Sequence, residues 1–160
     1  FLFQAYYIPS PSMEPSLGIG DRVIVNKLSY KLHDVNRGDM IVFGNPSQTN
    51  NEVSDLIKRV VALPGETLQV QDGKVYIDGN LMIEPYLAAS ETTSDFSTPA
   101  GCISSLEKAN ICVVPDDHVF VMGDNRWNSR DSRIFGPVPV ESIVGRAFVR
   151  VWPLGDFKRL

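Results

Sequence analysis

Short apolar runs separated by turn residues recur along the chain, and this pattern is typical of β-strands. Valine, isoleucine and aromatic residues are frequent in these runs, and glycine, proline, asparagine or aspartate bounds most of them. Helical periodicity is limited to single turns at 140–143 and 106–109. The sequence therefore predicts a mainly β protein, with strands at 22–26, 40–43, 56–63, 67–70, 74–77, 118–122 and 147–152.

Two turn signals in the middle of the chain indicate how neighbouring strands connect. Asp72-Gly73 lies between two apolar runs, at the spacing of a two-residue β-hairpin. Residues 78–80, with the sequence Asp-Gly-Asn, turn the chain again. We therefore expect a small β-meander in this part of the chain.

The first eight residues, Phe1 to Ile8, are largely apolar and admit two interpretations. The run is far shorter than the ~20 residues that a membrane-spanning helix needs. A buried first strand is one interpretation. The other is the remnant of an upstream membrane anchor, and the absence of Met at position 1 favours a processed or shortened chain.

Polar and small residues are concentrated between residues 84 and 117, which suggests an excursion from the main sheet. We expect one domain over 1–160, with a core at about 1–77 and 116–160 and a polar, cap-like β-rich excursion at about 78–115. Cys102 and Cys112 lie in this excursion. A disulfide between them would stabilise the loop by roughly 2–3 kcal/mol in an oxidising compartment. Two free thiols are the alternative.

The composition narrows the classes of function. The chain has 160 residues, of which 43% are hydrophobic and 21% charged, as in an ordinary globular protein. Its net charge of -4 and its lack of a basic stripe argue against nucleic-acid binding. The two histidines, His33 and His118, are far apart and have no metal-ligand spacing around them. We expect neither a metal nor a cofactor.

Ser12 is the first candidate for chemistry. It follows Pro9, Ser10 and Pro11 and precedes Pro15, so the segment should be stiff and irregular and should hold Ser12 in one orientation. A serine hydroxyl acts as a nucleophile only when a base is close to it. His33 lies in a polar turn and His118 begins a strand, so neither suits that role well.

Lys58 is the better candidate base. Strand alternation places it on the same face as Leu56 and Val60. A lysine held among apolar groups loses hydration, which lowers its pKa towards the working pH. The alternative is that Lys58 points to solvent from an amphipathic strand. Residues 122–133, rich in charges, amides and hydroxyls, form either a solvated loop or a shell around this lysine.

Taken together, these segments resemble the bacterial type I signal peptidases (signal peptidase I, peptidase family S26), which are membrane-bound Ser/Lys proteases. The resemblance implies a signal-peptidase/LexA-like complex of antiparallel sheets that forms a barrel-like catalytic core. The matching stretches follow the order of the family and are 9–17, 20–27, 37–43, 57–66 and 123–133.

The resemblance also implies a role for each matched position. Ser12 would be the nucleophile and Lys58 the general base, the Ser12 N–H and the Ser10 hydroxyl would form the oxyanion hole, and Ser129 would orient the amine of Lys58. The structural ion-pair residues match Arg59, Asp124, Asp131 and Arg133. The walls of the substrate pockets match Tyr6, Ile8, Met13, Val23, Val42 and Ile57.

The implied activity is that of a monomeric serine endopeptidase that removes signal peptides from exported preproteins after Ala-x-Ala. It would act through an acyl-enzyme, on the extracytoplasmic side of the bacterial cell membrane. Four aromatic residues near the termini would rest on lipid headgroups or, alternatively, pack at the chain ends: Phe1, Phe3, Trp152 and Phe157.

Two positions depart from the family pattern, and two other functions remain open. Pro11 stands where a small or polar residue is common, and Trp127 where aspartate is frequent. One alternative is a LexA-like Ser/Lys autoprotease, although the Ala100-Gly101 bond lies well downstream of Ser12. The other is a non-enzymatic β-barrel binding module in which Ser12 and Lys58 never meet.

Overall fold

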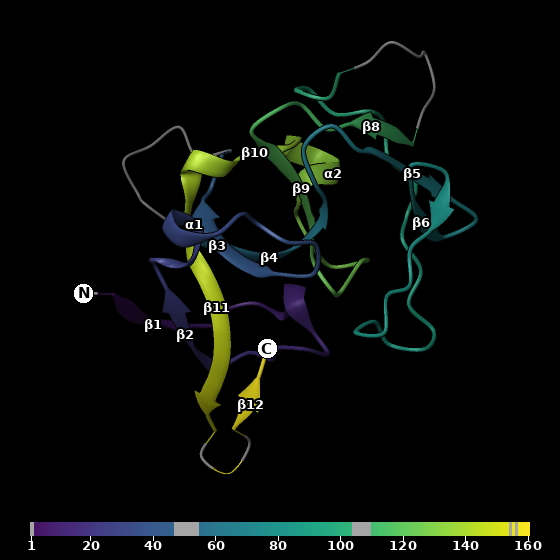
Figure 1. The fold of residues 1–160 in the computed structure, drawn as a ribbon. Helices are drawn as coiled ribbons and strands as arrows, with labels where there is room; N and C mark the ends of the chain where they lie inside the picture. Colours follow the sequence, from purple (N-terminus) through teal and green to yellow (C-terminus); the bar gives the residue numbers. More distant parts are fainter. Residues whose placement is uncertain (1, 47–54, 104–109, 154, 156) are drawn as a thin grey trace.

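The fold consists of two antiparallel β-sheets with a few short helical turns (Figure 1). The structure is a computed structural model that describes residues 2–46, 55–103, 110–153, 155 and 157–160. The prediction of a mainly β protein is confirmed. In the described part of the chain, no helix is long and apolar enough to cross a lipid bilayer.

The larger sheet has the spatial order β1-β2-β11-β3-β4-β9-β10, with β12 paired to β11. Its strands are β1 (Phe3–Tyr7), β2 (Arg22–Asn26), β3 (Met40–Gly44), β4 (Asp55–Ala62), β9 (His118–Met122), β10 (Val138–Pro139), β11 (Ile143–Trp152) and β12 (Lys158–Arg159). In the described residues β1 and β10 end this order and do not pair with each other. The expected barrel-like closure is therefore wrong, and the sheet is open.

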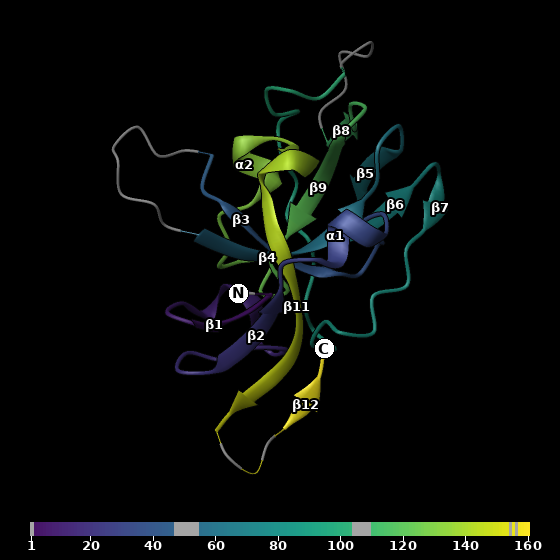
Figure 2. The same ribbon diagram turned by 60° about the vertical axis from the view of Figure 1, so that its left-hand side comes forward.

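The smaller sheet has the order β7-β6-β5-β8 and lies to one side of the larger one, at the right of Figure 2. Its strands are β5 (Thr67–Gln71), β6 (Lys74–Ile77), β7 (Asn80–Leu81) and β8 (Ile111–Val113). The predicted hairpin at Asp72-Gly73 joins β5 to β6, and both turn residues have the positive φ that such a turn requires. A disulfide joins Cys102 to Cys112 of β8.

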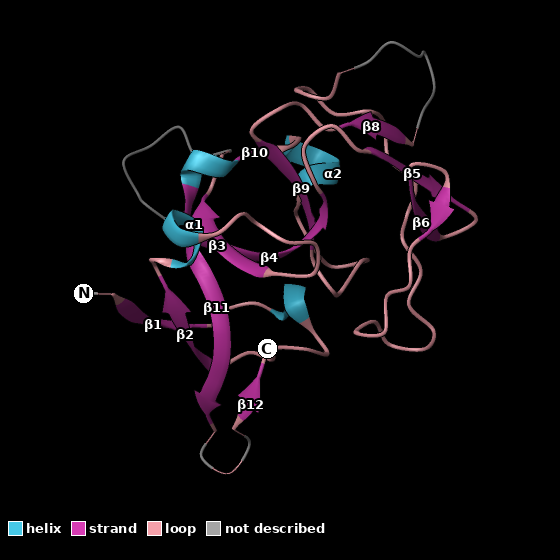
Figure 3. Cartoon of the chain, viewed as in Figure 1, coloured by secondary structure: helices cyan, strands magenta, loops and turns pink. Residues whose placement is uncertain are grey.

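The helical elements are short, and both tight turns and long loops connect the strands (Figure 3). The elements are η1 (Pro11–Met13), α1 (Ser29–Leu32), α2 (Ser132–Phe135) and η2 (Val140–Ser142). The predicted turn at 140–143 corresponds to η2, whereas the one at 106–109 lies outside the described residues. Four-residue helices such as α1 and α2 are too short to show a helical period, so the pattern did not reveal them.

The predicted strands are present, with ends that differ by a few residues. The run at 147–152 is the second half of β11. The first strand also forms, but as the edge strand β1, and four of its five residues are exposed, so the expectation that it is buried is wrong. Phe1 lies outside the described residues.

The segment that carries Ser12 is anchored by apolar side chains on either side of it. Ile8 is buried, and Met13 and Leu17 are inaccessible to solvent. All three pack in one core cluster with residues of β2, β3 and β11. This packing fixes η1 against the larger sheet, so the stiffness predicted from the prolines comes equally from burial.

Gly123, directly after β9, lets the following loop cross very close to Ser12. A Cβ at Gly123 would lie 2.4 Å from the Ser12 carbonyl oxygen and 2.3 Å from Ser129 Oγ. Rotation of the Ser129 hydroxyl would not relieve the clash, because the Ser12 carbonyl belongs to the backbone and Ser129 Cβ also lies 2.5 Å away. The observed packing therefore requires glycine at position 123, because any other residue would place a Cβ there.

We expect Gly123→Ala to lower the free energy of unfolding by about 1–3 kcal/mol, because one extra methyl must displace backbone in a packed region. The measurement is urea unfolding followed by circular dichroism. Gly18→Ala is the matched control, since nothing lies within 4 Å of a Cβ at Gly18. Equal midpoints for the Gly123→Ala variant and the parent protein would contradict this packing.

Candidate active site

The structure brings Ser12 and Lys58 together, although they are 46 positions apart in the chain. The Lys58 Nζ donates hydrogen bonds to Ser12 Oγ at 2.8 Å and to the carbonyl oxygen of Ile57 at 2.9 Å. Lys58 is 3% exposed and Ser12 is 7% exposed. The solvent-facing alternative for Lys58 is thus excluded, and a hydroxyl and an amine meet in a site with little access to water.

Burial is the main reason that the pKa of Lys58 falls from 10.5 to about 8. The carboxylates of Asp131 and Asp124 act in the opposite direction and limit the decrease. Near pH 8 a large fraction of the amine is therefore uncharged. An uncharged amine has a free lone pair and can accept the proton of Ser12.

Two neighbours fix the immediate surroundings of Ser12. Ser10 Oγ lies 3.3 Å from Ser12 Oγ. The backbone N–H of Asn125 donates to the Ser12 carbonyl at 3.1 Å, and its side-chain Nδ2 donates to the Pro11 carbonyl at 3.2 Å. Asn125 was not singled out from the sequence. Its position in the polar cluster at 122–133 was the only signal for it.

The first predicted ion pair joins Arg59 to Asp124 through two hydrogen bonds, of 2.8 and 2.7 Å. Arg59 also donates to the Gly38 carbonyl at 2.8 Å and lies 4.0 Å from the ring centroid of Tyr86. Both charged groups are buried. Arg59 follows Lys58 in β4, so this pair fixes the strand beside the amine.

The second predicted ion pair joins Asp131 to Arg133, again through two hydrogen bonds, of 2.9 and 2.8 Å. Asp131 also accepts the backbone N–H of Gly123 at 2.9 Å and caps α2. Arg133 donates to Ser94 Oγ of the excursion at 2.9 Å. The pair therefore ties the two ends of the loop after β9 together and attaches it to the excursion.

Arg126 forms a further network that was not predicted from the sequence. Its guanidinium is buried, donates to the Gly123 carbonyl at 2.9 Å and to Thr93 Oγ1 at 2.5 Å, and pairs with Glu84. Its backbone N–H donates to Glu91 at 2.6 Å. Partner residues from the excursion cannot be identified from sequence spacing, because they are 33 to 42 positions away.

Ser129 makes no hydrogen bond to Lys58 in this structure, so its role stays a prediction. Its Oγ is buried and has no hydrogen-bond partner among the described residues. The two hydrogen bonds of Lys58 go to Ser12 and Ile57, and no bond to Ser129 is present. Ser129 lies beside the backbone of Ser12, separated from it by Gly123.

A cleft opens beside the two polar groups, and four of the six predicted pocket residues line it: Tyr6, Ile8, Val42 and Ile57. The remaining two, Met13 and Val23, are inaccessible to solvent and belong to the core beneath the cleft. The Tyr6 hydroxyl donates to Asp55 Oδ2 at 3.1 Å and so links β1 to β4 across the cleft. Burial, followed by this hydrogen bond, raises the pKa of Tyr6 to about 12.

The two histidines, His33 and His118, lie away from this cleft. His33 is exposed at the end of α1, and His118 Nδ1 contacts the Asp116 carbonyl at 2.8 Å. Neither of them lines the cleft. Pro11 is the first residue of η1, and Trp127 is 69% exposed in the loop after β9.

Comparison with known proteins gives consistent results. The sequence matches the family described as "Signal peptidase, peptidase S26" over residues 1–152. A Synechocystis protein named "Probable signal peptidase I-2" is 44% identical over 96% of this chain and 65% of its own length. The signal peptidase I of Leptolyngbya laminosa is 43% identical over 100% of this chain and 74% of its own length. The chain therefore spans about two thirds to three quarters of the length of these relatives.

Among solved structures, a crystal structure of a signal peptidase I from Enterococcus faecalis V583 has 34% sequence identity and a TM-score of 0.55. The similarity covers 71% of this chain and 97% of that chain. The sequence match over nearly the whole chain and this shared fold agree with each other. The resemblance seen in the sequence is thereby confirmed, and the chain belongs to the signal peptidase family, peptidase S26.

Proposed function

We propose that this chain is the catalytic part of a serine endopeptidase that removes signal peptides from exported preproteins. The observation that carries the proposal is the 2.8 Å contact between the buried amine of Lys58 and the Ser12 hydroxyl, at the end of a cleft. The names of the relatives support the reaction class.

In the proposed mechanism, Lys58 is the general base and Ser12 the nucleophile. The uncharged amine takes the Ser12 proton while Oγ attacks the scissile carbonyl, and the resulting ammonium then protonates the leaving amine. This step leaves the signal peptide as an ester on Ser12. Lys58 next takes a proton from water, the hydroxide attacks the ester, and the proton returns to Ser12 as the acid is released.

The developing oxyanion would be stabilised by the backbone N–H of Ser12 and the hydroxyl of Ser10. The position of Ser10 Oγ, 3.3 Å from Ser12 Oγ, is suitable for this role. A donor of this kind is typically worth ~3–4 kcal/mol in the transition state. The two buried ion pairs, Arg59–Asp124 and Asp131–Arg133, would hold the site rigid without touching the substrate.

Ser129 is proposed as a positioning residue for the amine of Lys58. Its buried, unpaired hydroxyl supports this role, because such a group costs about 1–3 kcal/mol until it finds a partner. Hydrogen bonds in free enzymes are often incomplete and tighten only when the substrate binds.

The cleft favours an extended substrate with small side chains. Within the described residues, β4 pairs with β3 from Asp55 onward but with β9 only from Arg59, so its first residues have an unpaired edge beside the cleft. An extended peptide can add to such an edge through backbone hydrogen bonds. The apolar walls at Ile8, Val42 and Ile57 would then select small residues, in agreement with an Ala-x-Ala junction.

The proposed location is the extracytoplasmic side of the bacterial cell membrane. The disulfide supports an oxidising compartment, since disulfides seldom persist in the cytosol. Exposed aromatic side chains at Phe3, Trp152 and Phe157 support contact with lipid headgroups. One chain supplies both Ser12 and Lys58, so we propose that the protein acts as a monomer. We also propose that it uses no cofactor. The net charge of -4 supports a protein that does not bind nucleic acid.

The first prediction from the proposed function concerns the two reacting groups. Ser12→Ala, Lys58→Ala and Lys58→Arg should each lower kcat by about a thousandfold or more on a peptide with an Ala-x-Ala junction. The arginine variant fails because a guanidinium cannot act as a base at neutral pH. The assay is peptide cleavage followed by chromatography, with melting temperatures recorded to exclude unfolding.

Lys31→Ala is the matched control, because Lys31 is an exposed lysine of α1. It should keep the parent activity. Near-full activity in any of the three variants at Ser12 or Lys58 would rule out this mechanism.

The second prediction concerns pH. Only the uncharged amine is active and the pKa of Lys58 is about 8, so kcat/KM should rise about tenfold per pH unit below pH 8 and level off above it. Initial rates from pH 6 to 10 on the same peptide measure this profile. A rate that is flat over that range would exclude Lys58 as the base.

The third prediction concerns the membrane. The protein should float with phospholipid vesicles in a density gradient, and Phe157→Ser should reduce the floating fraction severalfold because it removes an aromatic side chain that is 74% exposed. Ile83→Ser is the matched control, since Ile83 is 77% exposed but follows β7 in the smaller sheet. Failure of the parent protein to float, or equal losses in both variants, would exclude lipid contact through Phe157.

A further inference from the structure

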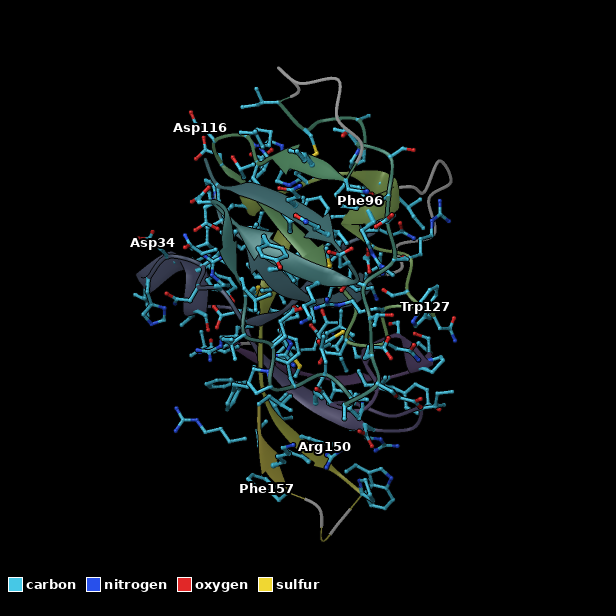
Figure 4. All side chains as sticks on the ribbon, turned by 90° about the vertical axis from the view of Figure 1, so that its right-hand side faces the viewer. Asp34, Phe96, Asp116, Trp127, Arg150 and Phe157 are labelled. Atoms are coloured by element: carbon cyan, nitrogen blue, oxygen red, sulfur yellow. A yellow bond between two sulfur atoms is a disulfide. The ribbon has the colours of Figure 1, made fainter. Side chains whose placement is uncertain are left out.

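A second groove, much larger than the cleft at Ser12, lies between the excursion and the loop after β9. It encloses about 510 Å³, against about 70 Å³ for the cleft. One wall is the segment 94–99 of the excursion, and the other contains Trp127, Ser129 and Ile134. Figure 4 shows Phe96 and Trp127 on the same side of the molecule. Ser129 and Arg133 of its lining have roles proposed above, but neither role involves a ligand in this groove.

The groove lies next to the proposed active site, on the other side of Gly123. Residues 55–58 of this strand border the cleft, and the next residue, Arg59, pairs with Met122 at the end of β9. The loop that begins at Gly123 therefore starts beside Lys58. Ser129 of this loop lines the groove and is separated from the Ser12 backbone only by Gly123. A chain that continues past the two reacting groups in this direction would reach the groove after crossing Gly123.

The direction of the chemistry identifies which part of the substrate arrives there. The cleft takes the residues before the scissile bond, and the amine that leaves the scissile carbonyl must lie at Lys58 to receive its proton. The residues after the scissile bond therefore leave the site on the Lys58 side. We propose that the groove binds the first residues of this segment, the start of the mature protein, in an extended conformation. The inference rests on the function proposed above.

The backbone of the excursion is arranged to receive an extended chain. The backbone of Phe96 is bound to Asn110. Its N–H donates to Asn110 Oδ1 at 2.7 Å, and its carbonyl accepts the Asn110 N–H at 2.9 Å. The residues before and after Phe96, Asp95 and Ser97, both line the groove. Within the described chain their backbone groups make no hydrogen bond, so they can pair with a peptide.

The side chains of the groove add an apolar surface and one charge. Trp127 is 69% exposed and Ile134 is 61% exposed, so both can be covered by a ligand. The two arginines in the lining, Arg126 and Arg133, are buried and paired with carboxylates. The exposed carboxylate of Asp95 is therefore the one charge that the described lining leaves uncompensated. Acidic residues in the mature segment should be disfavoured and basic ones favoured.

The test compares two peptide substrates with the same signal side and an Ala-x-Ala junction, ending one or eight residues after the scissile bond. In the parent protein, kcat/KM should be about tenfold higher for the longer peptide, and Trp127→Ala should reduce this ratio to about twofold. The ratio within each variant cancels any general loss of activity. Leu32→Ala, which changes an exposed residue of α1, is the control and should keep the tenfold ratio.

A second comparison tests the charge. Lys in place of Glu at the third position after the scissile bond should raise kcat/KM about threefold, and Asp95→Lys should reverse this preference. Equal rates for short and long peptides, or an unchanged length ratio in Trp127→Ala, would overturn the inference while leaving the proposed function intact.

Binding separates the two proposals if no peptide is cleaved at all. In that case the proposed function fails. The isolated eight-residue mature segment is then titrated into the Ser12→Ala protein while the indole N–H signal of Trp127 is followed by NMR. A saturable shift of that signal would support a peptide groove on its own, and an unchanged signal would overturn it.

Discussion

One costly feature constrains the rest of the structure: the Lys58 amine is buried against the Ser12 hydroxyl. A pKa lowered from 10.5 to about 8 corresponds to about 3 kcal/mol against the charged amine. Since the folded protein releases this proton more readily than the unfolded chain, stability rises between about pH 8 and pH 10.5. The core around Ile8, Met13 and Leu17 must offset this cost at neutral pH.

The acidic residues of the ion pairs around the site also affect the pKa of Lys58. Asp124 and Asp131 both favour the charged form of Lys58, yet each carboxylate is held by an arginine through two hydrogen bonds. Burial outweighs both carboxylates, so the amine keeps a lowered pKa although two acids are near. The loop after β9 therefore supplies rigid support, and through Arg126 it attaches the excursion to the site.

Sequence periodicity predicted most of the strands because strand alternation is a local property. It also placed Lys58 on an apolar face. It could not show that the larger sheet stays open, that Met13 and Val23 lie beneath the cleft, or that Asn125 holds the Ser12 backbone. These features depend on contacts between distant segments. The pairing of Arg126 with Glu84 is of the same kind, since spacing alone does not reveal which charges meet.

The central claim is that folding itself makes the Lys58 amine a base, and its pKa can be measured directly. The protein is labelled with ¹³C at lysine Cε, and the Lys58 signal, assigned with Lys58→Arg, is followed by NMR from pH 6 to 11. We expect a midpoint near 8, well below that of the exposed lysines. A midpoint near 10.5 would contradict this account, because almost all of the amine would then be charged at neutral pH.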